Sequence, residues 1–427
     1  MDVSRRAGTV NKIVPLIDIS LRLVHRIEVS GLENYSRSPS TLVVMNHRRD
    51  SDGPIVAGVL LLRQGMGVNG VMPYFVARED LFRKGFLKEY LETWPGAIRE
   101  LLGLLDLRSV LKALHVCPMR RVRERTLGEV LEDSLELFGD KPLADVLRPS
   151  WLAQFESLAP ATRRGALTLC NALERRYRPL LLQEYGLRKL NRLFFDAMKL
   201  NDSRVIESQL QHIVSLLEQG ETVFLTPEGM IPVDGRFERF RAGLHILVNR
   251  PRTSLRVLPA GITYDFMTSG RQSVFLNLGR ELSGLKGLSR KDVDNRVAKA
   301  IVGQLTVTAS HLASQLLMSY RTNGHRRFMA GELVERVGSD AQRCANAGAH
   351  VDPRLLDQRR LAKRMRQYFK YCVRRGMLLR NIDGTYDLHN GLEEPFVSWS
   401  VGIMDYINNE LATHAQLRSS VSGKLEA

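Results

Sequence analysis

Residues 40–54 read Ser-Thr-Leu-Val-Val-Met-Asn-His-Arg-Arg-Asp-Ser-Asp-Gly-Pro. The first six residues are mostly apolar and β-branched, which predicts a buried strand over residues 40–45. Gly53 and Pro54 form a turn, with proline at a first helical position, and the apolar residues 55–62 continue as a helix. The pattern therefore predicts a strand, a polar turn and a helix in direct succession.

The polar turn carries a histidine and an aspartate five positions apart, His47 and Asp52. Histidine titrates near neutral pH, and a carboxylate on one ring nitrogen fixes the tautomer, so the other nitrogen can accept a proton from a hydroxyl. This arrangement predicts a general base, which contributes roughly two to four orders of magnitude in rate. The alternative is that Asp52 only caps the helix and His47 is an ordinary surface histidine.

Three more short apolar segments end in polar or turn residues. Residues 221–226 predict a buried strand, and the Pro-Glu-Gly of residues 227–229 ends it with a carboxylate on the turn. A further strand is predicted over residues 255–264 and contains Pro259. Earlier in the chain, residues 115–121 form an apolar stretch that ends in two arginines. The chain thus presents four strand-end motifs in a fixed order.

These four motifs resemble those of the glycerolipid acyltransferase family, which has a PlsC-type domain and includes 1-acylglycerol-3-phosphate and glycerol-3-phosphate acyltransferases. In that family the histidine of a His-x4-Asp block deprotonates an acceptor hydroxyl, which attacks an acyl thioester. The resemblance implies that His47 is the base and that Asp52 orients it. It also implies an acceptor site at the residues that match the other blocks: Arg121, with Arg120 as a competing alignment, Glu228, Gly229 and Pro259.

The third block departs from the family pattern. The family usually continues Glu-Gly with Thr or Gly and then Arg, whereas residues 228–232 read Glu-Gly-Met-Ile-Pro. The missing arginine commonly helps to hold the acceptor's phosphate in this family. Arg236, Arg239 and Arg241 are an alternative source of that charge, because an arginine fork binds phosphate bidentately. The same three residues also fit a solvated helix start.

The spacing between the second and third blocks is long for this family, with 107 positions from Arg121 to Glu228. A helix predicted over residues 203–219 returns the chain to the next strand. Roughly residues 123–201 are then a basic helical insertion. Beside an active cleft this insertion would act as a lid or a lipid-facing surface, and the alternative is a purely structural extension.

The C-terminal part is predicted to be separate. A polar, glycine-containing segment near residue 322 predicts a boundary between an acyltransferase domain, residues 1–320, and a helical domain with a hairpin, residues 321–427. Residues 359–375 predict a basic amphipathic helix, and Asp383-Gly384 predicts a hairpin after it. This order is typical of winged-helix modules, which bind DNA. However, the hairpin tip carries an acid and no arginine, and a similar tail follows the catalytic domain of glycerol-3-phosphate acyltransferases, so nucleic acid is not the expected partner.

Composition frames these predictions. The chain has 427 residues, 44% of them hydrophobic, and a net charge of +16. Such a charge attracts anionic lipid, nucleic acid, or acidic acyl carriers. No run approaches the roughly eighteen uncharged apolar residues of a membrane span. Residues 1–26 lack a signal cleavage site and fit an amphipathic interfacial helix or one packed on the core. The scattered cysteines favour a reducing cytoplasm and no metal site: Cys117, Cys170, Cys344 and Cys372.

Together with the resemblance, the sequence predicts an α/β fold, a mixed sheet flanked by helices, with a helical insertion and a winged-helix-like tail. The expected reaction in phospholipid biosynthesis moves a fatty acyl chain from acyl-CoA or acyl carrier protein to a hydroxyl of lysophosphatidate or a related lysophospholipid, without a cofactor. Expected partners are the acyl thioester, a glycerophosphate or lysophospholipid acceptor and an anionic membrane surface. The expected location is cytoplasmic, peripheral to the inner face of a membrane. The alternatives are glycerol-3-phosphate acylation and a non-enzymatic lipid-surface or nucleic-acid-binding role.

Overall fold

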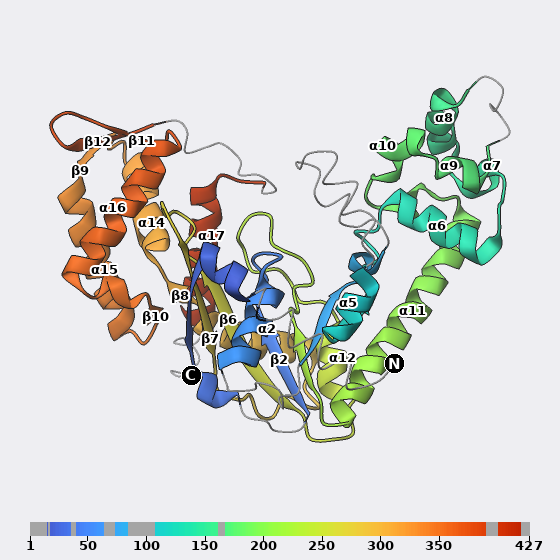
Figure 1. Cartoon of the computed structure of the whole chain (residues 1–427), viewed down its shortest axis with the longest axis horizontal. Coiled ribbons are helices and arrows are strands. Elements are labelled where there is room, and N and C mark those ends of the chain that lie inside the picture. The colour runs from blue at the N-terminus through green and yellow to red at the C-terminus, as the bar shows by residue number, and fades with distance from the viewer. Residues whose placement is uncertain are drawn as a thin grey trace. The chain divides into compact units, whose positions relative to one another are not determined.

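The structure is a computed structural model, and it divides the chain into two units (Figure 1). Unit 1 comprises residues 1–76, 113–116 and 213–427, and unit 2 comprises residues 77–112 and 117–212. Residues 18–24 are helical, but most of the helix predicted over residues 1–26 lies outside the described part of the chain. The structure describes residue 15 and residues 18–35, 40–63, 73–83, 107–160, 167–389 and 400–419.

A seven-stranded sheet forms the centre of the fold, in the order β1-β7-β6-β2-β5-β3-β4. Four of its pairings are parallel, namely β1 with β7, β2 with β5 and with β6, and β3 with β5, whereas β6 and β7 are antiparallel. This mostly parallel sheet, with helices packed around it, confirms the predicted α/β class. The strands are β1 (His25–Ser30), β2 (Thr41–Met45), β3 (Tyr74–Arg78), β4 (Val116–Met119), β5 (Thr222–Leu225), β6 (Arg256–Tyr264) and β7 (Gln272–Leu278).

Strand β2 lies inside the sheet, and its side chains are almost fully buried. Its register places Val44 beside Leu225 of β5 and beside Pro259 of β6. Because β2 and β5 run parallel, both leave the sheet at the same edge. The turn that carries His47 and the Pro-Glu-Gly turn after β5 are therefore brought to one place by strand pairing alone.

Helices of unit 1 cover the sheet and share a hydrophobic core with it. Helix α2 follows β2 directly, as the sequence predicts, and begins at Asp52. Helix α14 opens with a capping box in which Thr308 and His311 bond each other's backbone. The helices are α2 (Asp52–Arg63), α12 (Gly243–Asn249), α13 (Arg290–Gly303), α14 (Ala309–Thr322), α15 (Ala330–Asn346), α16 (Gln358–Arg374) and α17 (Ile403–Ser419).

The C-terminal segment contains a small antiparallel sheet of order β11-β12-β9. Its strands are β9 (Arg327–Met329), β11 (Leu378–Arg380) and β12 (Thr385–Leu388), and two-residue strands β8 (Thr306–Val307) and β10 (His350–Val351) pair nearby. Helix α16 precedes the hairpin of β11 and β12, which turns at Asp383-Gly384. The order of elements, including the third strand β9 before α15, is that of a winged helix.

The structure places this segment and the sheet in one unit with a shared hydrophobic core. Arg364 makes one of the contacts that join them. The sequence places it among the solvated cations of α16, but it is 2% exposed and donates to Asp265 at 2.5 Å, directly after β6. Helical periodicity predicts which residues of a helix share a face. It cannot predict that a cation on the buried face pairs with a buried carboxylate of another element.

Unit 2 has a hydrophobic core of its own, made of residues between Leu127 and Met198. The helix predicted over residues 203–219 begins earlier, at Arg192. Asp202 lies inside it, and its buried Oδ1 accepts from Arg125 at 2.6 Å and from Arg120 at 2.9 Å. The helices are α5 (Leu107–Ala113), α6 (Leu127–Phe138), α7 (Leu143–Val146), α8 (Pro149–Leu158), α9 (Leu169–Ala172), α10 (Arg178–Leu181) and α11 (Arg192–Glu218), the first and last of which continue into unit 1.

Within the described residues, every helix is too short or too polar to cross a lipid bilayer.

Candidate active site

The carboxylate of Asp52 is held in one orientation by four donors. Its Oδ2 accepts the backbone N–H groups of Arg48 at 2.6 Å and Arg49 at 3.0 Å, and it lies 2.9 Å from Nδ1 of His47. Its Oδ1 accepts the hydroxyl of Tyr264 at 2.6 Å. The side chain is 1% exposed, so water does not compete for these bonds. Asp52 therefore does more than cap α2: it is a fixed acceptor for the imidazole.

The imidazole of His47 is fixed at one nitrogen and open at the other. Because the carboxylate of Asp52 only accepts, Nδ1 carries the proton, and Nε2 holds the lone pair. The His47 side chain is 22% exposed, and among the described residues no hydrogen bond reaches Nε2. A neutral imidazole in this state can take a proton from a hydroxyl, which is the property required of a general base.

Glu228 joins the two turns at the edge of the sheet. Its Oε1 accepts the backbone N–H of His47 at 2.8 Å, and its Oε2 accepts the backbone N–H of Glu238 at 2.9 Å. Burial raises the pKa of this carboxyl, an effect that Arg48, 3.8 Å away, opposes. The sequence assigns Glu228 to the acceptor site, whereas in the structure both of its oxygens bond backbone amides. Its position is that of a brace for the His47 turn.

Arg48 and Glu410 form a buried ion pair behind this turn, and each is 1% exposed. Arg48 Nε donates to Glu410 at 2.7 Å, and Nη1 donates to the carbonyl of His47 at 3.2 Å. Burial alone would lower the pKa of Arg48, but the carboxylates of Glu410 and Glu228 raise it. Burial alone would raise the pKa of Glu410, but Arg48 and His311 lower it to about 2. The pair ties α17 to the turn that carries His47.

Tyr264 is the last residue of β6 and holds the Asp52 carboxylate through its hydroxyl. Its hydroxyl donates to Asp52, and the hydroxyl of Ser51 lies 3.0 Å away, where it can donate in turn. Burial and the Asp52 charge raise the pKa of Tyr264 well above its usual value, so the phenol stays protonated and remains a donor. The guanidinium of Arg49 stacks over Tyr264 at 5.1 Å and over Phe266 at 4.8 Å.

Gly229 and Arg241 pack together at the Pro-Glu-Gly turn. Gly229 has φ of 71°, and a Cβ at this position would lie 3.1 Å from Cγ of Arg241. Arg241 Nε lies 3.5 Å from the carbonyl of Glu228. By contrast, Arg239 is exposed, and Arg236 is 71% exposed beside Asp234. Of the three arginines proposed to replace the missing family arginine, Arg241 alone lies on this turn, and the other two fit the solvated alternative.

The remaining predicted site residues are Pro259 of β6 and Arg121, which follows β4. Pro259 is buried inside β6, and its carbonyl accepts the N–H of Gly279 at 2.7 Å, so its position is one of packing. Arg121 follows β4 in unit 2 and is half-buried. Its rival Arg120 donates to Glu79 at 2.6 Å and to Asp202 at 2.9 Å. Arg120 is therefore engaged in a carboxylate network.

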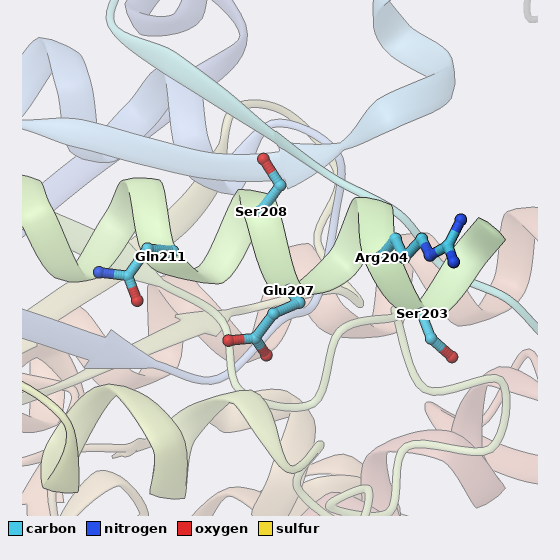
Figure 2. A pocket seen from close by; sticks show the side chains of 5 residues that line it. All are labelled: Ser203, Arg204, Glu207, Ser208 and Gln211. Atoms are coloured by element: carbon cyan, nitrogen blue, oxygen red, sulfur yellow. The ribbon is translucent and has the colours of Figure 1, made fainter. Parts of the chain in front are cut away.

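Sequence reasoning missed Glu410, His311 and the role of Tyr264. Glu410 lies 362 positions after Arg48, and no spacing rule connects them. The available signal was weak: Glu410 follows the apolar and amide residues 406–409. A hollow in unit 2 was not predicted either; its five lining side chains leave α11 in more than one direction (Figure 2): Ser203, Arg204, Glu207, Ser208 and Gln211.

Comparison with known proteins adds distant structural likeness. No protein-family model matches the chain, and no curated protein matches it. Among solved structures, the chain is similar to the crystal structure of the 1-acyl-sn-glycerophosphate (LPA) acyltransferase PlsC from Thermotoga maritima, with 15% identity and a TM-score of 0.35. The match covers 70% of this chain and 80% of that one.

Proposed function

We propose that this protein is an acyltransferase that moves an acyl chain from a thioester to a hydroxyl of a lysophospholipid or a related glycerophosphate. The observation that supports this most is the state of His47. Its Nδ1 is held by Asp52 at 2.9 Å, and its Nε2 is open on a ring that is 22% exposed. The order of the motifs also supports acyl transfer. The turn that carries His47 and the Pro-Glu-Gly turn, which are far apart in sequence, are joined in space through Glu228.

In the proposed reaction, Nε2 of His47 takes the proton of the acceptor hydroxyl as its oxygen attacks the thioester carbonyl. The Asp52 carboxylate stabilises the imidazolium that forms. The tetrahedral intermediate then collapses, the carbon–sulfur bond breaks, and the imidazolium returns its proton to the leaving thiolate. Tyr264 and two backbone amides keep Asp52 aligned, which maintains the tautomer through the cycle.

The acceptor's charge requires a cation near the Pro-Glu-Gly turn. Arg241 is our candidate there, because its guanidinium lies along Glu228 and Met230 and its side chain is half-buried. Arg121 is the second candidate, by its match to the second block. Lysophosphatidate or a related lysophospholipid is the preferred acceptor, with glycerol-3-phosphate as the alternative, and the donor is acyl-CoA or acyl carrier protein. We place the enzyme in the cytoplasm, peripheral to the inner face of a membrane.

The test measures free thiol released by purified protein from long-chain acyl-CoA, with lysophosphatidate, with glycerol-3-phosphate and without acceptor. His47→Ala is assayed beside the wild type. Acceptor-dependent release that the variant loses supports the proposal, and the better acceptor identifies the substrate class. Arg241→Gln is then expected to raise KM for a phosphate-bearing acceptor about tenfold, since it removes one charge-assisted contact. Arg239→Gln, on an exposed neighbour, is the matched control.

Absence of release with acyl-CoA is followed by the same assay with long-chain acyl carrier protein as donor. The proposal is contradicted if neither donor gives turnover, or if turnover persists in folded His47→Ala. If neither donor gives turnover, a non-enzymatic binding role fits the fold better.

A further inference from the structure

The winged-helix segment of unit 1 presents one strongly basic helix face. Helix α16 buries its apolar side, including Met365, Tyr368 and Cys372, against the core. The opposite side carries cations at helical spacing, so they lie in a single row along about 22 Å of helix. We call this row the α16 stripe, and all of its members are exposed: Arg359, Lys363, Arg366, Lys370 and Arg374.

Within the described part of the chain, no acidic side chain neutralises the stripe. Helix α16 contains no aspartate or glutamate between Gln358 and Arg374. Among the residues that the structure describes, no carboxylate forms an ion pair with any member of the stripe. By contrast, several other exposed arginines of unit 1 face an acid, as Arg327 faces Asp387 and Arg343 faces Asp340. Five adjacent uncompensated cations repel one another, so their arrangement favours an external polyanion.

Large aliphatic side chains accompany these cations. Ile382, at the tip of the hairpin that follows α16, is fully exposed, and Leu379 of β11 is 50% exposed. Val373 of α16 is 40% exposed. A wing that enters a nucleic-acid groove needs cations at its tip, whereas this tip carries Ile382 and Asp383. Exposed aliphatic side chains on α16 and on the hairpin that follows it fit the boundary between lipid headgroups and acyl chains.

We propose that the α16 stripe and the hairpin tip form a docking surface for an anionic membrane. The cations contact the headgroup phosphates, and Ile382 and Leu379 enter the interface. The partner is a lipid surface, and a nucleic-acid duplex is the competing occupant that the test separates from it. The inference goes beyond the proposed function because it assigns a surface remote in sequence from His47, and its test uses no turnover.

The test is co-sedimentation of the full chain with phosphatidylcholine vesicles that contain or lack phosphatidylglycerol. Binding is expected only to the anionic vesicles. Each basic side chain near such a surface strengthens binding about fivefold, so Lys363→Gln/Arg366→Gln/Lys370→Gln is expected to weaken it roughly 100-fold. The matched control, Lys291→Gln/Arg296→Gln/Lys299→Gln, removes three exposed cations from α13, a helix that also carries acids, and is expected to change binding only a fewfold.

Two further variants test whether binding depends on charge or on residue type, and whether the ligand is a lipid surface or a nucleic-acid duplex. Lys363→Arg/Lys370→Arg keeps the charge and is expected to bind as the wild type does. Ile382→Ser is expected to weaken vesicle binding about tenfold, because it removes an inserted aliphatic group, and to leave duplex binding unchanged. Thermal unfolding verifies that each variant is folded.

Three outcomes would overturn the inference. One is equal loss in the α16 and α13 variants, which would show a diffuse charge effect. Another is vesicle binding that survives in the folded α16 variant. The third is wild-type affinity for a DNA duplex that exceeds its affinity for anionic vesicles and falls with the α16 substitutions.

Discussion

The pairs His47–Asp52 and His311–Glu410 of unit 1 differ in exposure and in what the second ring nitrogen does. His47 lies 2.9 Å from Asp52, and His311 lies 3.2 Å from Glu410. His47 is 22% exposed with Nε2 open, whereas His311 is 2% exposed. In His311 the other nitrogen, Nδ1, accepts from the backbone of Thr308 at 3.1 Å, so both ring nitrogens are engaged.

The comparison teaches that a histidine–carboxylate pair is not in itself a sign of catalysis. His311 completes a capping box and pairs with Glu410. Glu410 in turn accepts from Arg48, which also donates to the carbonyl of His47. The buried pair therefore supports the turn, and the exposed pair presents a lone pair to solvent. The predictions below separate these two roles.

The largest expected difference is between His47→Ala and His311→Ala. Removing the base should lower acceptor-dependent turnover by roughly two to four orders of magnitude, with little change in the unfolding midpoint. Removing His311 should lower the free energy of unfolding by about 1–3 kcal/mol, because it leaves buried polar groups unpaired, and should spare the rate per folded molecule. Kinetics and urea unfolding of both variants measure this, and equal rate losses would contradict the division of roles.

Glu410→Ala should destabilise the protein strongly. It leaves the guanidinium of Arg48, which is 1% exposed, without its nearest carboxylate, a loss that typically costs about 3–5 kcal/mol. Urea unfolding followed by circular dichroism gives the change in free energy. Glu335→Ala, which removes an exposed carboxylate from α15, is the control and should be close to neutral. A similar effect in both variants would rule out a structural role for the Arg48–Glu410 pair.

Stability should fall in acid because of Glu410. Its pKa is about 2 in the folded protein against an ordinary value of 4.5. A depressed carboxyl pKa contributes stability that is fully present above pH 4.5 and is lost as the pH falls toward 2. The contribution is about 3 kcal/mol by the size of the shift. Unfolding free energy measured from pH 6 to 2 should have a shallower slope in Glu410→Gln, and an unchanged slope would refute the assignment.

Tyr264→Phe should have the smallest effect. The substitution removes one hydrogen bond to Asp52, worth about 1–1.5 kcal/mol, so kcat should fall about tenfold while KM is unchanged. Tyr320→Phe removes a comparable bond to Glu332 at 3.0 Å and should leave kcat as it is. A change in KM alone would mean that Tyr264 contacts the acceptor instead of positioning Asp52.

Local patterns predicted the strand, turn and helix around His47 well: the observed strand is Thr41–Met45 and the helix begins at Asp52. They succeed there because burial of an apolar strand and a proline-containing helix start are local properties. Residues such as Glu410, Tyr264 and Arg364 could not be found in this way. Their partners lie 362, 212 and 99 positions away, and only the folded sheet brings them together.

The role of Glu228 illustrates the same limit. A carboxylate on a turn after a strand signals a site, but its spacing does not tell whether the oxygens face a substrate or the backbone. In the structure both oxygens accept backbone N–H groups, of His47 and Glu238. Similarly, three arginines near Gly235 looked equivalent in sequence, and packing against Gly229 distinguished Arg241 from the other two.

The most direct test of the account is a double-mutant cycle on acceptor-dependent thiol release, with wild type, His47→Ala, Asp52→Asn and the double variant. If His47 and Asp52 act as one base, Asp52→Asn lowers the rate on its own and adds nothing in the His47→Ala background. Losses that multiply in the double variant, or a folded Asp52→Asn protein with the full rate, would contradict the central claim.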